Sequence, residues 1–63
     1  MIRRAKVGDR VVQLRPIALH GTIVCAVRRG RRVQLDVMRD NGRLRTNMFP
    51  AELIREEAWE RQK

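Results

Sequence analysis

Residues 21–38 read GTIVCAVRRGRRVQLDVM and contain two strand patterns separated by a turn signal. Thr22–Val27 is a run of β-branched and small apolar residues that is too short for an ordinary helix. Val33–Met38 alternates apolar and polar residues, and a period of two places the apolar side chains on one face of a strand, toward a core. Because Gly30 lies between the two runs, the stretch predicts a hairpin of two strands.

On the N-terminal side, a further strand is predicted at Arg10–Leu14. Val7–Asp9 precedes it and has turn chemistry, because glycine tolerates a positive φ and the aspartate side chain can bond the backbone beyond it. Pro16 ends the strand, since proline has no backbone N–H to donate. Residues 15–20 are then predicted to form a loop that includes His20.

On the C-terminal side, Asp40–Gly42 predicts a second hairpin turn. Asn-Gly readily supplies the two positive φ values of a type I′ turn. The strand that follows, Arg43–Met48, alternates again, so that Leu44, Thr46 and Met48 are predicted to share a face.

The last part of the chain is predicted to turn once more and to end in a helix. Pro50 fixes the corner, and the residues after it suit either one 3₁₀ turn or the start of a helix. Leu53 and Ile54 can add a fifth strand before a helix-favouring tail, in which Glu57 and Arg61 are spaced for an ion pair. Short strands with tight turns and no strand–helix–strand alternation predict an all-β fold, a small barrel or sandwich with a short C-terminal helix.

The composition indicates one small, basic domain. The chain has 63 residues and carries 15 Lys and Arg against 7 Asp and Glu, for a net charge of +8, and 13 of the basic residues are arginine. The arginine side chain presents a planar fork that matches phosphate or carboxylate, so this balance favours an anionic partner. The alternative is that the charge only keeps the protein soluble.

The chain is expected to be cytoplasmic. Its single cysteine, Cys25, cannot form an internal disulfide and is predicted to be a small buried residue in a reducing compartment. No apolar run of about 18 residues and no signal-peptide pattern is present, so no membrane association is predicted.

The sequence argues against an enzyme, a metal centre or a cofactor site. It contains no serine and no tyrosine, so a nucleophile beside a base could come only from a chance meeting of Cys25 and His20. One cysteine and one histidine leave only carboxylates to complete a metal site, and no acidic cluster has ligand spacing. No glycine-rich phosphate loop opens a helix. We therefore predict a protein without catalytic residues, metal or cofactor.

Several short motifs resemble those of the SH3-like small barrels of the KOW and Tudor type. They are Val7–Val11, Gly21–Val24, a strand that ends in Asp-Asn-Gly, and Phe49–Leu53. The resemblance implies five strongly bent antiparallel strands with a 3₁₀ turn before the last, and domains of this type bind nucleic acid or protein. It divides the chain into a basic N-terminal segment that is a mobile arm or the start of an edge strand (residues 1–6), the barrel (7–55) and a C-terminal helical tail (56–63).

Two narrower resemblances concern shorter stretches. Thr46–Pro50 stands where the plasmid-encoded type II dihydrofolate reductases, which are SH3-like barrels that form a tetramer around one pore, carry Val-Gln-Ile-Tyr-Pro. The four residues before the proline all differ, and Gln13 stands at the place of that family's pore lysine, so the resemblance implies the scaffold and not the activity. Arg55–Arg61 is similar to the C-terminal helix of the carbon storage regulators, which bind RNA, but the segment before it is longer than in that family.

The basic loop Arg28–Arg32 is the sharpest functional feature of the sequence. The hairpin would gather its four arginines at one tip, and guanidinium groups can bond phosphate oxygens in bidentate fashion. The loop therefore predicts a surface that follows the backbone of DNA or RNA, and the alternative is a solvated, self-repelling loop. The predicted nucleic-acid-binding residues are Arg28, Arg29, Arg31, Arg32, Arg39, Arg43, Arg45 and Lys6, to which Arg3 and Arg4 could add a flexible arm.

A protein-interaction or assembly module is a second class of function that the sequence leaves open, ahead of a third, a pore enzyme like the type II dihydrofolate reductases. Exposed sheet edges accept a partner strand. The tail could also pack Ile54, Ala58 and Trp59 against a second copy to form a homo-oligomer. Phe49 and Trp59 are the only aromatic residues, and both are expected in the core or in such an interface.

Overall fold

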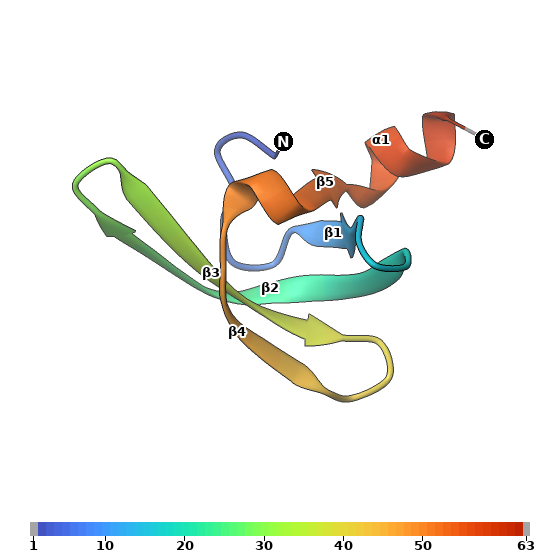
Figure 1. Cartoon of the computed structure of the whole chain (residues 1–63), viewed down its shortest axis with the longest axis horizontal. Helices are drawn as coiled ribbons and strands as arrows, with labels where there is room; N and C mark the ends of the chain where they lie inside the picture. The colour runs from blue at the N-terminus through green and yellow to red at the C-terminus, as the bar shows by residue number, and fades with distance from the viewer. Residues whose placement is uncertain (1, 63) are drawn as a thin grey trace.

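The fold is one antiparallel sheet of five strands followed by a short helix (Figure 1). The computed structural model describes residues 2–62, so the predictions that extend to Met1 and Lys63 lie outside the described residues. The predicted all-β class and C-terminal helix are confirmed. The elements are β1 (Arg10–Gln13), β2 (Leu19–Arg29), β3 (Arg32–Arg39), β4 (Leu44–Met48), the 3₁₀ helix η1 (Pro50–Glu52), β5 (Leu53–Arg55) and α1 (Glu56–Arg61).

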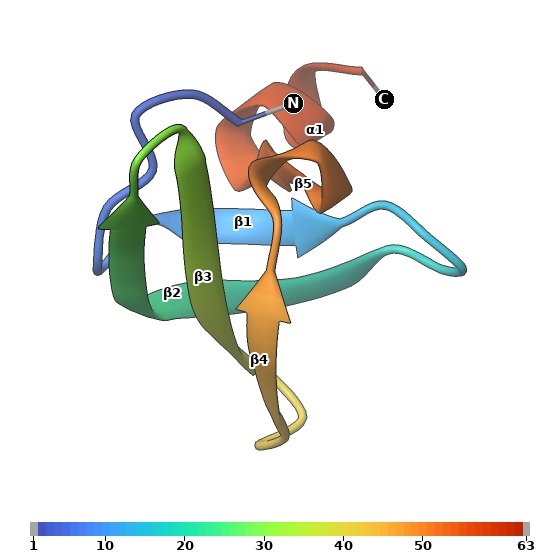
Figure 2. The same cartoon turned by 60° about the vertical axis from the view of Figure 1, so that its left-hand side comes forward.

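β2 connects the two halves of the sheet. The strand order is β4-β3-β2-β1-β5, and residues 19–22 of β2 pair with β1 while residues 21–29 pair with β3. A bulge between Ile23 and Cys25 interrupts the ladder, and bulges bend a strand and increase its twist. Figure 2 shows the result: β2 first runs alongside β1 and then turns, so that the half containing β3 and β4 crosses the half containing β1 and β5.

The closure into a barrel that the resemblance implies is not confirmed. Among residues 2–62, β4 pairs only with β3, and β5 pairs only with β1, so the sheet is open between these two strands. They are connected by η1, which has Pro50 at its start. A 3₁₀ turn therefore does precede the last strand, as expected.

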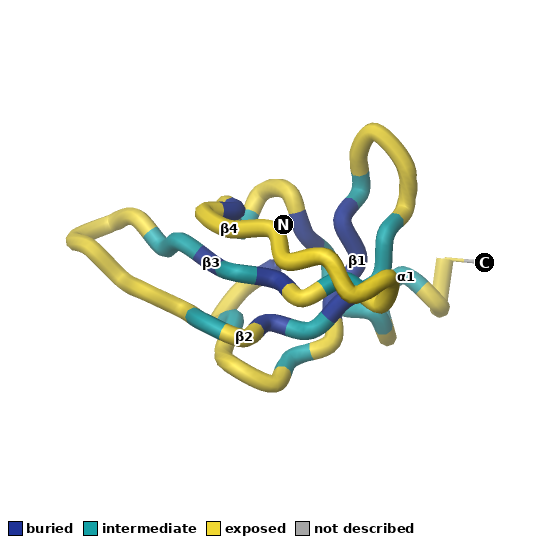
Figure 3. The backbone as a smooth tube through the Cα atoms, turned by 90° about the horizontal axis from the view of Figure 1, so that it is seen from below, coloured by how far each residue is buried: buried dark blue, intermediate teal, exposed yellow. Residues whose placement is uncertain are grey.

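The core lies between the two halves of the sheet and includes Ile2 of the N-terminal segment. Figure 3 colours the buried stretches of β1, β2 and β3 dark blue. Ile2 is 4% exposed, and its N–H donates to the carbonyl oxygens of Leu53 at 3.0 Å and of Pro50 at 3.3 Å. A buried apolar side chain and β5 thus anchor Ile2, and the basic N-terminal arm over residues 1–6 stays a prediction. The core cluster consists of Ile2, Val11, Ile23, Leu35, Val37, Met48 and Leu53.

Gly21 allows the backbones of β2 and β3 to lie unusually close together near the point where the two halves of the sheet cross. It is buried and lies opposite Arg39 in the ladder. A Cβ atom at this position would lie 2.7 Å from the carbonyl oxygen of Met38 and 2.7 Å from Cγ1 of Val37. Only glycine lets the two backbones come this close.

The turn between β3 and β4 differs from the predicted type I′ turn. Within Asp40–Gly42 only Gly42 has a positive φ, 85°. The N–H of Arg39 donates to the carbonyl of Arg43 at 2.9 Å, and the N–H of Gly42 donates to that of Arg39 at 2.9 Å. This is a three-residue loop with glycine in the left-handed position, which needs one positive φ instead of two.

A bulge in the β3–β4 ladder changes which side chains of β4 share a face. Across it, the Asp36 carboxylate accepts a hydrogen bond from the N–H of Asn47 at 3.0 Å. Met48 therefore lies opposite Leu35 and is buried, whereas Leu44 lies on the other face and is 51% exposed. The prediction that Leu44 and Met48 share a face is wrong, because strict alternation holds only in a strand without a bulge.

Candidate functional site

A groove is lined by residues of the N-terminal segment, the β2–β3 hairpin and the segment around η1. Its volume is about 890 Å³, and sites for small organic ligands span about 300–1,000 Å³. Its lining combines apolar and cationic side chains and contains no acidic residue. The apolar residues include Ile2, Ala5, Val27, Val33, Phe49 and Pro50. The cationic residues are Arg3, Arg4, Arg28, Arg31 and Arg32, and we call this site the arginine groove.

The β2–β3 hairpin gathers four arginines at its tip, as the sequence predicts. β2 ends at Arg29, β3 begins at Arg32, and Gly30 takes a φ of 58° in the two-residue turn between them. Arg28, Arg31 and Arg32 line the groove, but Arg29 does not. The tip therefore contributes three of its four arginines to the site.

The N-terminal wall of the groove is held by Arg55. Its Nη2 donates to the carbonyl oxygen of Arg3 at 2.8 Å, and its Nη1 donates to Oδ2 of Asp9 at 3.0 Å. A hydrogen bond from the N–H of Lys6, together with the Arg55 guanidinium, lowers the pKa of Asp9, so this anchor stays charged. The backbone is thus fixed while the side chains of Arg3 and Arg4 are exposed.

Phe49 is the aromatic residue of the groove. Its side chain is 47% exposed and does not lie in the core, whereas the expected alternative, an interface, stays a prediction. Its N–H donates to Oε2 of Glu52 at 2.7 Å, and the N–H of Glu52 donates to the carbonyl of Phe49 at 2.9 Å. Pro50 follows and favours the extended backbone that Phe49 adopts. Two hydrogen bonds and a proline therefore fix the backbone that carries the ring.

The ion pairs found among the described residues leave out the groove arginines. All five are exposed. Within residues 2–62, the ion pairs join carboxylates to Arg10, His20, Arg55 and Arg61 and to none of the groove arginines. A concave surface lined by one sign of charge attracts the opposite charge, so the groove is suited to an anion.

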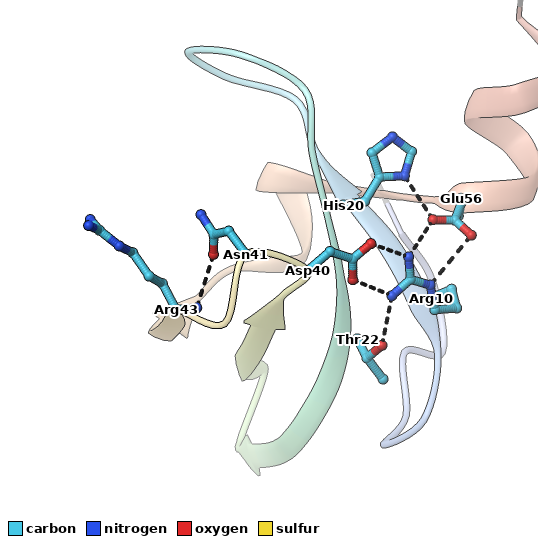
Figure 4. Close-up of polar contacts among 7 residues, drawn as sticks. All are labelled: Arg10, His20, Thr22, Asp40, Asn41, Arg43 and Glu56. Carbon is cyan, nitrogen blue, oxygen red and sulfur yellow. Dashed lines mark hydrogen bonds and ion pairs between the residues drawn. The ribbon is translucent and has the colours of Figure 1, made fainter.

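A second group of charged residues ties β1 to the β3–β4 turn and to α1 (Figure 4). Arg10 donates to both carboxylate oxygens of Asp40 at 2.7 Å, to Oε2 of Glu56 at 2.8 Å and to Oγ1 of Thr22 at 3.0 Å. Nδ1 of His20 lies 2.8 Å from the same Glu56 oxygen. We call these residues the Arg10 cluster. His20 belongs to β2 and not to a loop, which corrects the prediction for this residue.

The Arg10 cluster predicts that the fold is sensitive to acid. Hydrogen bonds from Arg10 lower the pKa of Asp40 and, together with one from His20, that of Glu56. A carboxylate whose pKa is lower in the folded state stabilises the fold above its ordinary pKa of about 4. This contribution is lost as the pH falls through the folded pKa. We therefore expect the urea midpoint to fall as the pH is lowered from about 5 to about 2.

The Arg10→Met variant tests the origin of this acid sensitivity. Without the guanidinium, the pKa values of Asp40 and Glu56 return toward their ordinary range, so the midpoint should depend less on pH than in the wild type. Arg29→Met removes an exposed arginine outside the cluster and is the control, which should keep the wild-type profile. The same pH profile in all three proteins would contradict a role for the cluster.

The other predicted binding residues lie outside the groove. Arg39 is half-buried, its Nη2 donates to Oε1 of Gln13 at 2.6 Å, and it does not line the groove. Arg43 and Arg45 are exposed but lie toward the β3–β4 turn, at the opposite end of β3 from the hairpin tip (Figure 1). Lys6 is exposed beside the N-terminal wall but does not line the groove.

Four other residues singled out in the sequence are half-buried. Cys25 is a free thiol and is half-buried. Ile54, Ala58 and Trp59 are half-buried as well, and α1 packs against β1 and β5. In the described part of the chain, no three His, Cys, Asp or Glu side chains come together in a way that could hold a metal ion. None of its helices is long and apolar enough to cross a bilayer.

Comparison with known proteins does not identify a relative. No family model matches the chain, and no curated protein and no solved structure shows significant similarity to it. Its function is therefore inferred from its residues and their arrangement.

Proposed function

We propose that the protein binds nucleic acid in the arginine groove by contacting the phosphate backbone. The observation that supports this most is that five exposed arginines from two distant segments line one concave surface without any acidic residue. A guanidinium can offer two parallel N–H groups to one phosphate, and it sheds water more easily than an ammonium group. Several such groups close together suit a polymer that carries a phosphate at every nucleotide.

The architecture is compatible with this proposal. The bent β2 and the 3₁₀ turn before β5 agree with the small-barrel resemblance of the KOW and Tudor type, whose members bind nucleic acid or protein. A fold does not by itself select a ligand, so the groove and its charge support the choice of nucleic acid. A nucleic-acid partner and a free Cys25 are also consistent with a cytoplasmic protein.

A salt series tests the proposed function. Each phosphate contact releases counterions, so the logarithm of the binding constant should fall linearly with the logarithm of the salt concentration. With all five groove arginines on phosphates, the slope of the log binding constant against the log salt concentration reaches about −3.5 for single strands and about −4.5 for duplexes. We expect a clear negative slope in fluorescence anisotropy with labelled oligonucleotides. No binding of single strands or duplexes at low salt would rule out the proposal.

A further inference from the structure

Phe49 is an exposed aromatic residue that the fold does not need for its core. Almost half of its side chain is accessible, although hydrogen bonds from its own N–H and to its own carbonyl fix its backbone. The ring lines the same groove as the five arginines. A flat apolar surface beside several cations suits a ligand that has both a flat apolar face and an anionic group.

We propose that the arginine groove takes unpaired nucleotides of single-stranded nucleic acid, with a base stacked on Phe49 and the phosphates bound by the groove arginines. This inference rests on the proposed function and adds which form of nucleic acid the site accepts. Every base has a π-face, so stacking on an aromatic ring tolerates any sequence. DNA and RNA share this chemistry, and both enter the test below.

The size of the groove favours a single strand over a duplex. The whole molecule measures 35 × 23 × 21 Å, and the groove of about 890 Å³ is only one part of its surface. Such a groove can hold individual nucleotides but cannot surround a double helix. In a duplex the bases are stacked on each other and paired, so their faces cannot reach Phe49.

The apolar lining of the groove also favours a single strand over a duplex. Ile2, Val33 and Pro50 line it together with Phe49. Against the backbone of a duplex these side chains would meet charged phosphates, which do not favour contact with apolar surface. An unpaired base can instead cover apolar surface while its phosphate remains at the arginines.

The β2–β3 hairpin places a groove arginine on the same face of the sheet as an apolar residue of the groove. Its tip projects from the core and is exposed (Figure 3). Arg28 lies opposite Val33 in the ladder, and directly opposed residues project from the same face of a sheet. The same face of the hairpin thus offers one apolar and one cationic side chain to a nucleotide.

The test compares Phe49→Ala with the wild type on three labelled probes: oligo(dT), oligo(U) and a DNA duplex of the same length. A length of about 12 nucleotides is suitable, since one small barrel of the OB type covers about 4–16. We expect the wild type to bind the single strands more tightly than the duplex at equal salt. We expect Phe49→Ala to weaken single-strand binding by roughly 5- to 100-fold, with an unchanged salt slope and unchanged duplex binding.

Two further variants keep the test decisive. Leu44→Ala removes a side chain of similar exposure, 51% against 47%, from the β4 end away from the groove and should bind like the wild type. Phe49→Leu retains an apolar side chain without the ring, so it should lose single-strand affinity even if Phe49→Ala folds poorly. Thermal unfolding followed by circular dichroism establishes that each variant is folded.

The outcomes separate this inference from the proposed function. Equal affinity of the wild type for duplex and single strands, or unchanged single-strand affinity in folded Phe49 variants, would overturn the stacking and leave phosphate binding intact. Binding of poly-glutamate as tightly as of the oligonucleotides would show that the groove recognises an anionic polymer without bases, and would also overturn it. Absence of binding to all three probes at low salt would remove both proposals.

Discussion

Replacing Arg28, Arg31 and Arg32 together by alanine is expected to weaken binding of single-stranded nucleic acid about 100-fold at about 0.1 M salt. Each phosphate contact on a single strand contributes about 0.7 to the slope of log affinity against log salt, so the slope should also become shallower by about 2. All three residues are exposed at the hairpin tip and line the groove, so their loss removes charge without opening the core. Fluorescence anisotropy over a salt series measures both quantities.

A matched variant separates the groove from net charge alone. Arg15, Arg43 and Arg61 are exposed and lie outside the groove lining, and their triple replacement by alanine changes the net charge by the same amount. We expect this control to keep most of the wild-type affinity and slope. If both triple variants lost affinity equally, binding would depend on overall charge, and the groove would not be the site.

Leu35→Ala is expected to lower the free energy of unfolding by about 2–5 kcal/mol. Leu35 is fully buried and belongs to the core cluster, where its side chain on β3 lies between the two halves of the sheet. A chain of this length has a total stability of only about 3–9 kcal/mol at 0.05–0.15 kcal/mol per residue. The substitution should therefore unfold a substantial fraction of the molecules at room temperature.

Urea unfolding followed by circular dichroism tests this expectation. Leu44→Ala is the matched control, because it shortens a leucine that is 51% exposed, and its effect should stay within about 0.5 kcal/mol. A Leu35 variant with the midpoint of the wild type would mean that the two halves of the sheet do not pack on each other as described.

The local elements of the fold could be predicted from the sequence because they follow from neighbouring residues. The alternation in Val33–Met38 and the glycine at position 30 correctly indicate β3 and the hairpin turn. The bulges could not be predicted, since each depends on how one strand aligns with its partner. The bulge beside Asn47, for example, is stabilised by the carboxylate of Asp36 on the neighbouring strand.

The candidate site could be predicted only in part. The arginines of Arg28–Arg32 are adjacent in the sequence, and the turn necessarily gathers them. The opposite wall depends on the burial of Ile2 and on the contact between Arg55 and Arg3, which are 52 residues apart. The Arg10 cluster likewise joins residues separated by 30 and 46 positions, and no spacing rule indicates such contacts.

Phe49 shows where composition alone left the position of a side chain open. With only two aromatic residues in the chain, both were expected in the core or in an interface, because large apolar side chains are usually buried. A cue was nevertheless present, since Phe49 stands between the end of a strand pattern and Pro50, where the chain must turn at the surface. The position of a large apolar residue relative to a turn is thus as informative as its hydrophobicity.

The open sheet has a consequence for the behaviour of the protein at high concentration. Within residues 2–62, β4 is hydrogen-bonded along one side only, and such an edge can recruit the edge of another molecule and start aggregation. This strand is only five residues long, its ladder contains a bulge, and Arg43 and Arg45 lie at its start. A short strand, an irregular ladder and repulsion between like charges all oppose pairing between the β4 edges of two molecules. The arginines at this edge would then keep copies of the protein dispersed.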